Sequence, residues 1–284
     1  MAAHIQAFYH TSTSTISYVV FDQEGGHCIV IDSALDFDFS SGEVSAEFAD
    51  QLVDFIEVND LTIVWILETH AHADHLSAAS YLKKCLGGKI GVGQGIDQVQ
   101  EYFKASLDLG DDLFSAGHDG FDHRFVDNEV FSFGHLAGKV LSTPGHTSDS
   151  VTYLIEGNAF VGDTIFMPDF GSARCDFPGG NAEQLYDSIS LLYQLPNETI
   201  LWMCHDYQPG GRELRYQVTV SESKKQNVHI PSTMAKDEFV VFRTQRDAQL
   251  NVPKLLYPSV QVNIRAGQLP NGYFKIPSVN SLKR

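Results

Sequence analysis

Short apolar runs separated by polar turns recur along the chain. Each run is bounded by Gly, Asp or Asn and is too short for an ordinary helix, so each predicts a strand. These runs cover residues 16–21, 28–31, 63–67, 151–155, 159–161 and 200–203.

Three other segments repeat their apolar positions with helical spacing. They are residues 45–59, 76–86 and 182–195. The first places Phe48, Leu52 and Ile56 on one face, and the second is followed by Gly87, a residue typical of the position after a helix. Strands and helices interleave without a regular strand-helix-strand alternation, which predicts an α/β sandwich of mixed sheets.

The composition is that of a folded protein in a reducing compartment. Of the 284 residues, 43% are hydrophobic and 19% are charged, which is enough to form a substantial core. No apolar run approaches the roughly 18 residues of a membrane-spanning helix, and the first residues lack the features of a secretion signal. The four cysteines form no CxxC pair. We therefore expect a cytoplasmic protein without a membrane partner.

Charge is distributed unevenly along the chain. The formal net charge is −17, which repels nucleic acid phosphates and argues against a nucleic acid partner. Residues 1–220 carry nine basic and 32 acidic residues, whereas residues 221–284 carry ten basic and four acidic ones. We expect the basic C-terminal segment to pack on the acidic body. The acidic stretch 104–127 has little periodicity and is interpreted as an insertion or lid.

The sequence Glu68-Thr69-His70-Ala71-His72-Ala73-Asp74-His75 directly follows the predicted strand 63–67. Alternate residues of a strand point the same way, so His70 and His72 share a side, and the turn into the next helix brings Asp74 and His75 back toward them. Converging imidazole and carboxylate groups are the ligands of transition metals. The motif therefore predicts a metal site.

Three further donors stand where strands pass into loops: His146 in Thr-Pro-Gly-His-Thr, Asp163 in Gly-Asp-Thr and His205 in Cys-His-Asp-Tyr. Each alone is typical of a turn. Together with the first motif they resemble the metallo-β-lactamase superfamily over roughly residues 5–220. The resemblance implies an αββα sandwich of two mixed sheets flanked by helices. It also implies a catalytic domain at 1–220 on which the basic segment 221–284 packs.

The residues that flank these donors are similar to those of persulfide dioxygenases, particularly the bacterial β-lactamase-like branch. The similar segments are 162–166, 171–180, 205–207 and 261–267. The resemblance implies one non-haem Fe(II) per chain, held by His70, His146 and Asp163, with three coordination positions left open. Its implied substrates are glutathione persulfide and O₂, which with water give sulfite and glutathione, a reaction of sulfide detoxification.

By the resemblance, the remaining donors do not bind the iron themselves but orient its ligands or hydrogen-bond to its bound water. The alternative is that they hold a second metal ion. These donors are His72, Asp74, His75 and His205. It also implies substrate contacts from Arg174, Tyr207 and, in the basic segment, Arg265. A salt bridge from Arg174 to Asp176 and simple packing of Tyr207 are the alternative interpretations.

One departure from the family pattern, the roles of two cysteines and two competing functions remain to be considered. The stretch before Cys175 is Gly-Ser-Ala-Arg, where human-type persulfide dioxygenases have Gly-Cys-Gly-Arg. Cys175 and Cys204 flank the site, and each is either reactive toward persulfide or an ordinary packed thiol. The competing function is a two-metal hydrolase similar to glyoxalase II, which cleaves a glutathione thioester without O₂. A non-catalytic metal or sulfide sensor is a third hypothesis, and a homodimer is compatible with each.

Overall fold

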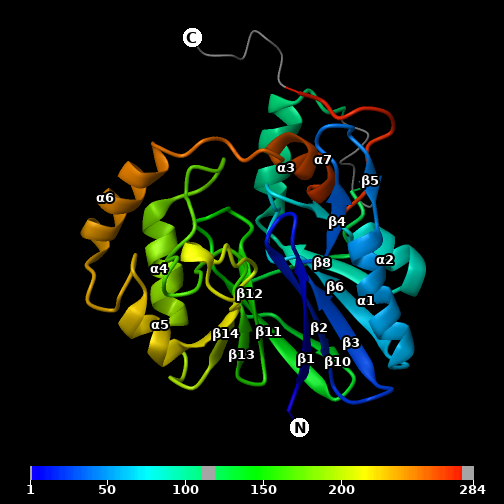
Figure 1. Ribbon diagram of the computed structural model, residues 1–284, viewed down its shortest axis with the longest axis horizontal. Coiled ribbons are helices and arrows are strands. Elements are labelled where there is room, and N and C mark those ends of the chain that lie inside the picture. Colours follow the sequence, from blue (N-terminus) through cyan, green and yellow to red (C-terminus); the bar gives the residue numbers. More distant parts are fainter. Residues whose placement is uncertain (1, 111–118, 277–284) are drawn as a thin grey trace.

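Two mixed β-sheets face each other and helices cover their outer sides in the computed structural model, which describes residues 2–110 and 119–276 (Figure 1). Figure 1 shows α1 (Glu47–Val58) and α2 (Ala79–Leu86) beside one sheet, and α4 (Ala182–Leu192) beside the other. The predicted αββα sandwich is therefore confirmed.

The first sheet has the strand order β1-β2-β3-β6-β8-β9. Its strands are β1 (His4–His10), β2 (Thr15–Phe21), β3 (His27–Ile31), β6 (Thr62–Leu67), β8 (Lys89–Gly93) and β9 (His123–Phe125). The first three pair antiparallel, and β3, β6, β8 and β9 pair parallel. Because parallel strands end at one edge, the loop after β6 opens at the edge where β3 also ends.

The second sheet has the order β10-β11-β12-β13-β14-β15. Its strands are β10 (Val130–Phe133), β11 (Leu136–Ser142), β12 (Val151–Ile155), β13 (Asn158–Phe160), β14 (Ile200–Trp202) and β15 (Gln217–Thr219). Only β13 and β14 pair parallel within it. A small sheet joins β5 (Val44–Ser45), β4 (Ala34–Phe37) and β7 (Leu76–Ser77).

The alternation of side chains along the central strands explains why the layers stack. Ile29 and Ile31 of β3 join the apolar cluster between the two sheets, whereas Cys28 and Val30 join the cluster beneath α1 and α2. All four are fully buried. A strand that contributes to a core on both faces must be apolar throughout, which is the pattern seen in the sequence.

The remaining helices are α3 (Ile96–Ser106), α5 (Val220–Gln226), α6 (Lys236–Asp247), α7 (Leu256–Asn263) and a 3₁₀ turn, η2 (Pro209–Gly211). In the described part of the chain, none of the helices is long and apolar enough to cross a membrane. The six predicted strands and three predicted helices are all present, and the strand 151–155 has the predicted bounds. The largest shifts are at two helices: residues 76–77 form β7 before α2 begins, and α4 ends at Leu192 instead of residue 195.

The interpretation of residues 104–127 as a lid is wrong for its described part. Lys104 belongs to α3, Phe121 is buried, and residues 123–125 form β9, which pairs with β8. Residues 111–118 of the segment lie outside the described residues. Phe125 is the one apolar residue of β9, so no local pattern marks this strand, and pairing with β8 determines its structure.

The C-terminal segment contributes side chains to the core. Phe239 of α6 is fully buried in the cluster that α4 shares with the second sheet. Val260 and Val262 of α7, with Ile264 after it, are fully buried in the cluster of the first sheet. Apolar burial of this extent holds the segment in place independently of its charge.

Candidate metal centre and adjoining cavity

The loop that follows β6 is fixed by two buried carboxylates. Asp32 accepts hydrogen bonds from the backbone N–H of Thr69 at 2.7 Å and from its hydroxyl at 2.8 Å. Asp149 accepts a hydrogen bond from the backbone N–H of Ala71 at 2.7 Å. These bonds hold the backbone on both sides of His70, so its imidazole has little freedom to turn.

His70, His146 and Asp163 form one set of converging donors in the described part of the chain. Asp163 Oδ2 lies 3.9 Å from His70 Nε2 and 3.8 Å from His146 Nε2. His146 Nδ1 donates to the carbonyl of Arg174 at 2.7 Å, which leaves the lone pair on Nε2. The Thr69 hydroxyl donates to Asp32, so His70 Nδ1 donates to Thr69 Oγ1 and likewise leaves Nε2 free.

A second set of converging donors consists of His72, Asp74, His75 and His205. His205 Nε2 lies 3.2 Å from Asp74 Oδ2, and His75 Nδ1 lies 3.4 Å from Asp74 Oδ1. His72 Nε2 bonds to Asp32 Oδ1 at 3.1 Å and therefore does not join the first set. The rings of His70 and His72 lie next to each other, with centroids 4.0 Å apart, as the sequence predicts, but they belong to different donor sets.

The buried donor atoms at the centre lack hydrogen-bond partners among the described residues. They are Nε2 of His70, His75 and His205, Nδ1 of His72 and Oδ1 of Asp163. A buried polar atom without a partner costs roughly 1–3 kcal/mol, so such a cluster requires something to bind. A metal cation fits, because the lone pairs of several imidazoles and a carboxylate point at the same place.

Burial keeps two of these imidazoles neutral. Burial and the neighbouring His72 lower the pKa of His70, and burial lowers the pKa of His75 to about 3. Burial would also lower the pKa of His72, but Asp32 and Glu68 raise it well above its usual value. Neutral imidazoles offer lone pairs at neutral pH, as metal ligands must.

Sequence reasoning missed three residues that position the donors. Asp32 directly follows a predicted strand, and Asp149 lies three residues after His146, so both stood where strands meet loops. The Asn263 side chain donates to the carbonyls of His72 and His75, each at 2.8 Å, and accepts from the N–H of Ser77. It lies on α7, far away in sequence, within the segment 261–267 that resembles persulfide dioxygenases, but the resemblance did not give it a role.

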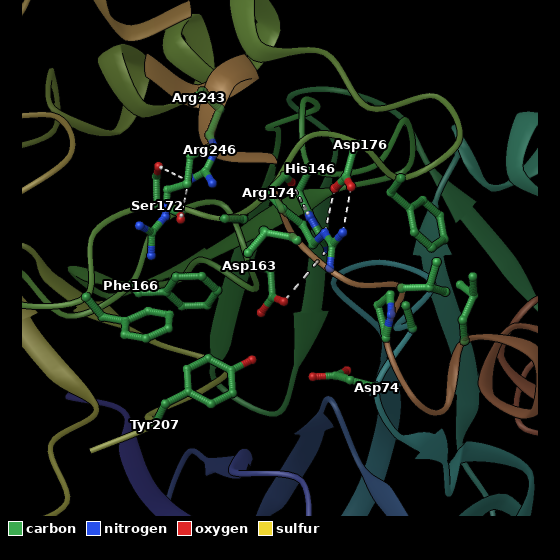
Figure 2. Close-up of a pocket in the computed structure, with 18 of the residues that line it drawn as sticks. Asp74, His146, Asp163, Phe166, Ser172, Arg174, Asp176, Tyr207, Arg243 and Arg246 are labelled. Atoms are coloured by element: carbon green, nitrogen blue, oxygen red, sulfur yellow. Dashed lines mark hydrogen bonds and ion pairs between the residues drawn. The ribbon is translucent and has the colours of Figure 1, made fainter. Parts of the chain in front are cut away.

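A cavity of about 350 Å³ adjoins the first donor set. This volume is within the range of about 300–1,000 Å³ that is usual for small-molecule sites. Figure 2 shows Asp74 and Asp163 at one side of it, Phe166 and Tyr207 along a wall, and Arg246 on the side formed by α6.

The structure brings Arg174 and Tyr207 to this cavity but not Arg265. Arg265 is 5% exposed, and its guanidinium donates to the backbone carbonyls of Gln261 and Gln268. Its contacts therefore stabilise the end of α7. Burial lowers the pKa of Arg265, although not enough to deprotonate a guanidinium.

Arg174 lines the cavity with its donors already engaged. Its guanidinium binds both oxygens of Asp176 and donates to the carbonyl of Asn251 at 2.8 Å. The salt bridge that the sequence left as an alternative is thus present. Its backbone carbonyl, as noted, orients His146, so Arg174 acts on the donor set through its main chain.

Tyr207 stacks on His205, with ring centroids 5.5 Å apart and planes at 11°. Desolvation in the cavity, with Asp74 and Asp163 nearby, raises the pKa of Tyr207 well above its usual value. The phenol therefore stays protonated and can donate a hydrogen bond to a ligand.

The two cysteines beside the site are thiols rather than thiolates. Burial raises the pKa of Cys175 to about 12 and raises the pKa of Cys204 as well. A protonated thiol is a weak nucleophile, so the structure favours the interpretation of both as packed side chains.

Residues 12–205 match the family model described as the metallo-β-lactamase superfamily. A probable metallo-hydrolase of Burkholderia pseudomallei is 46% identical over 295 residues, which cover 96% of this chain and 98% of that protein. Glyoxylase B2 of Dictyostelium discoideum is 44% identical, with 99% of each chain covered.

Two more distant relatives carry another description. The human mitochondrial persulfide dioxygenase ETHE1 is 25% identical over 93% of this chain and 88% of its own. The crystal structure of ETHE1 from Myxococcus xanthus superposes on this chain with a TM-score of 0.75 at 26% sequence identity. The match covers 93% of this chain and 100% of the Myxococcus xanthus chain.

Proposed function

The chain belongs to the metallo-β-lactamase superfamily, and from this premise we propose that it is a persulfide dioxygenase with one Fe(II) per chain. In the proposed reaction, glutathione persulfide, O₂ and water give glutathione, sulfite and two protons. The outer sulfur atom of the persulfide is oxidised and O₂ is reduced, so atoms and electrons balance without a further reductant.

The convergence of the first donor set carries this proposal. His70, His146 and Asp163 form a two-histidine, one-carboxylate set, while Asp32 holds His72 out of it. Such a set would hold Fe(II) and leave open positions at which a persulfide and O₂ bind side by side, so that electrons pass between them. The descriptions of the human and Myxococcus xanthus relatives support the same activity.

Residues of this chain prepare the cavity for an anionic sulfur compound. The Arg174 carbonyl keeps the His146 lone pair directed at the donor set, and Tyr207 offers a phenol proton beside it. The rings of Phe166, Phe170 and Phe177 line the cavity and make part of its wall apolar. Polar interactions with a ligand are stronger beside such a wall than in bulk water.

A second candidate function is a two-metal hydrolase of a glutathione thioester. Two observations favour it. The four donors His72, Asp74, His75 and His205 converge as a second metal site would require, and the relatives at 44–46% identity are described as a metallo-hydrolase and a glyoxylase. A hydrolase of this kind generates a metal-bound hydroxide nucleophile and consumes no O₂.

Metal analysis of protein purified without oxygen separates the two candidates. The proposal predicts about one iron per chain, because a single donor set is used for binding. Two tightly bound zinc ions per chain in native protein would contradict it and support the hydrolase. The metal content is measured by mass spectrometry against the protein concentration.

A further inference from the structure

Three arginines line the cavity, and they differ in what their guanidinium groups bind. Arg174 is engaged by Asp176 and Asn251. Arg243, which is 1% exposed, donates to Asp247 and to the carbonyl of Ser172. The Arg246 guanidinium, by contrast, has no hydrogen bond or ion pair with any residue in 2–110 or 119–276.

The free guanidinium belongs to the last turn of α6 and lines the cavity. Figure 2 shows Arg246 beside Arg243 and Ser172, on the α6 side. Arg246 is exposed to solvent and lines the cavity, so its guanidinium is available to a ligand that enters there. An arginine in this situation is suited to an anionic ligand.

His229 provides a second donor on the same side of the cavity. Its Nδ1 accepts a hydrogen bond from the N–H of Ser172 at 3.0 Å, so the neutral ring carries its proton on Nε2. Gly171 makes this contact possible, because a Cβ at that position, where φ is +102°, would lie 2.1 Å from His229 Nδ1. The ring is thus fixed by its neighbours.

The neutral state of His229 also follows from its surroundings. Burial, then Arg243 and Arg246, lower the pKa of His229 to about 4. Arg246 and His229 both line this cavity. Together the two side chains present one full positive charge and one neutral N–H donor.

We propose that Arg246 and His229 form a subsite that binds a carboxylate of the substrate. One cation with one neutral donor matches the single charge of a carboxylate better than the double charge of a phosphate. A planar guanidinium also pairs with a carboxylate through two parallel hydrogen bonds. The identity of the ligand as a glutathione derivative rests on the proposed function.

This assignment makes the C-terminal segment a determinant of specificity. Arg246 comes from α6, and Leu250, Val252 and Leu256, which follow it, line the same cavity. The segment would therefore select substrates that carry a carboxylate at a fixed place relative to the reacting sulfur. Simple persulfides without a carboxylate would lose this contact.

The test measures binding of S-methylglutathione, which cannot react, to the metal-loaded full chain by calorimetry. Arg246→Gln is expected to weaken binding by about tenfold to a hundredfold, the usual effect of losing a charged hydrogen bond. The dimethyl ester of the same ligand should bind the wild type more weakly, and Arg246→Gln should weaken it no further. Arg246→Lys should restore part of the affinity.

Lys236→Gln is the matched control, because it removes one positive charge from the same helix. Lys236 is partly exposed and paired with Asp187, and it does not line the cavity. Binding should be unchanged in this variant. The inference would be overturned if Arg246→Gln bound S-methylglutathione as tightly as the wild type does. It would also be overturned if the substitution weakened binding of S-methylglutathione and of its dimethyl ester equally, or if the wild type did not bind S-methylglutathione at all.

The binding test does not depend on turnover, so the proposed function can fail separately. If the wild type consumes no O₂ with glutathione persulfide but the Arg246 effect on binding remains, the dioxygenase assignment is wrong and the carboxylate subsite stands. If O₂ is consumed and Arg246→Gln binds the analogue normally, the subsite is wrong and the dioxygenase assignment stands.

Discussion

His70 and His72 lie two positions apart, yet their imidazoles have different neighbours. His70 Nε2 faces Asp163, whereas His72 donates to Asp32 and belongs to the other donor set. His70→Ala should therefore remove most of the iron, because one of three proposed ligands is lost, and His72→Ala should retain much of it. Iron per chain is measured after anaerobic purification. Equal iron loss in both variants would contradict the separation of the two sets.

Asp32 is a fully buried carboxylate with three donors around it. It accepts from both groups of Thr69 and from His72. Asp32→Ala should lower the free energy of unfolding by about 3–5 kcal/mol, as expected when one partner of a buried charged pair is removed. Denaturant titration gives this value. Asp54→Ala, an exposed change on α1, is the control and should stay within about 0.5 kcal/mol of the wild type.

Site residues could be predicted from the sequence where several metal-binding side chains stand close together or directly after a predicted strand. His70, His146 and Asp163 each end a strand or follow one, and the structure brings them together as expected. Arg265 was expected at the substrate and lies elsewhere, while Arg246 and His229, which line the cavity, were not singled out. A single arginine carries no local pattern, so only the packing of α6 and α7 determines which one reaches the cavity.

At the scale of elements, α7 supports the donor loop from the far end of the chain. The Asn263 amide bonds to the carbonyls of His72 and His75 and to the N–H of Ser77. Asn263→Ala leaves these buried groups without partners and should cost at least about 2 kcal/mol of stability. Unfolding by denaturant measures it, and the exposed Asn271→Ala should change little. A loss equal to that of Asn271→Ala would show that water replaces the amide.

Burial of α7 can be tested with a pair of isoleucines. Ile264 is fully buried, whereas Ile276 is 77% exposed. Ile264→Ala should lower the free energy of unfolding by about 2–5 kcal/mol, the usual cost of a cavity in a core. Ile276→Ala should have an effect below about 0.5 kcal/mol. Similar small effects at both positions would mean that α7 is only loosely attached in solution.

The strands of the central layers could be predicted because burial on both faces makes them continuously apolar. The edge elements could not. The strand β1 mixes His4, Gln6 and His10 with apolar residues, and β9 has three residues within an acidic stretch. For such elements, pairing with a neighbouring strand contributes more than the side chains do, and the sequence alone does not reveal the neighbour.

For the whole molecule, the buried donor atoms without partners make the stability of the folded state depend on a bound metal. Several buried nitrogen and oxygen atoms in the centre lack partners among the described residues, so a bound cation would stabilise the folded state. Removal of the metal with a chelator should lower the melting temperature, because metal at 100 times its dissociation constant adds roughly 2.7 kcal/mol. Calorimetry measures the shift. His70→Ala should show a much smaller one, and an equal shift would place the bound metal elsewhere.

The basic C-terminal segment packs on the acidic body of the molecule. Screening at physiological salt limits attraction between exposed charges to roughly 8 Å, so charge alone would not hold it. Phe239, Val260 and Val262 supply the apolar contacts, and they place Arg246 in the cavity. The same segment thus completes the core, the donor loop and the proposed subsite.

Oxygen consumption on glutathione persulfide is the most direct measurement of the central claim. Iron-loaded protein should consume one O₂ for each sulfite formed, and His70→Ala should consume none. Absence of O₂ uptake by protein with a full iron content, together with hydrolysis of a glutathione thioester, would contradict the claim and identify the chain as a hydrolase.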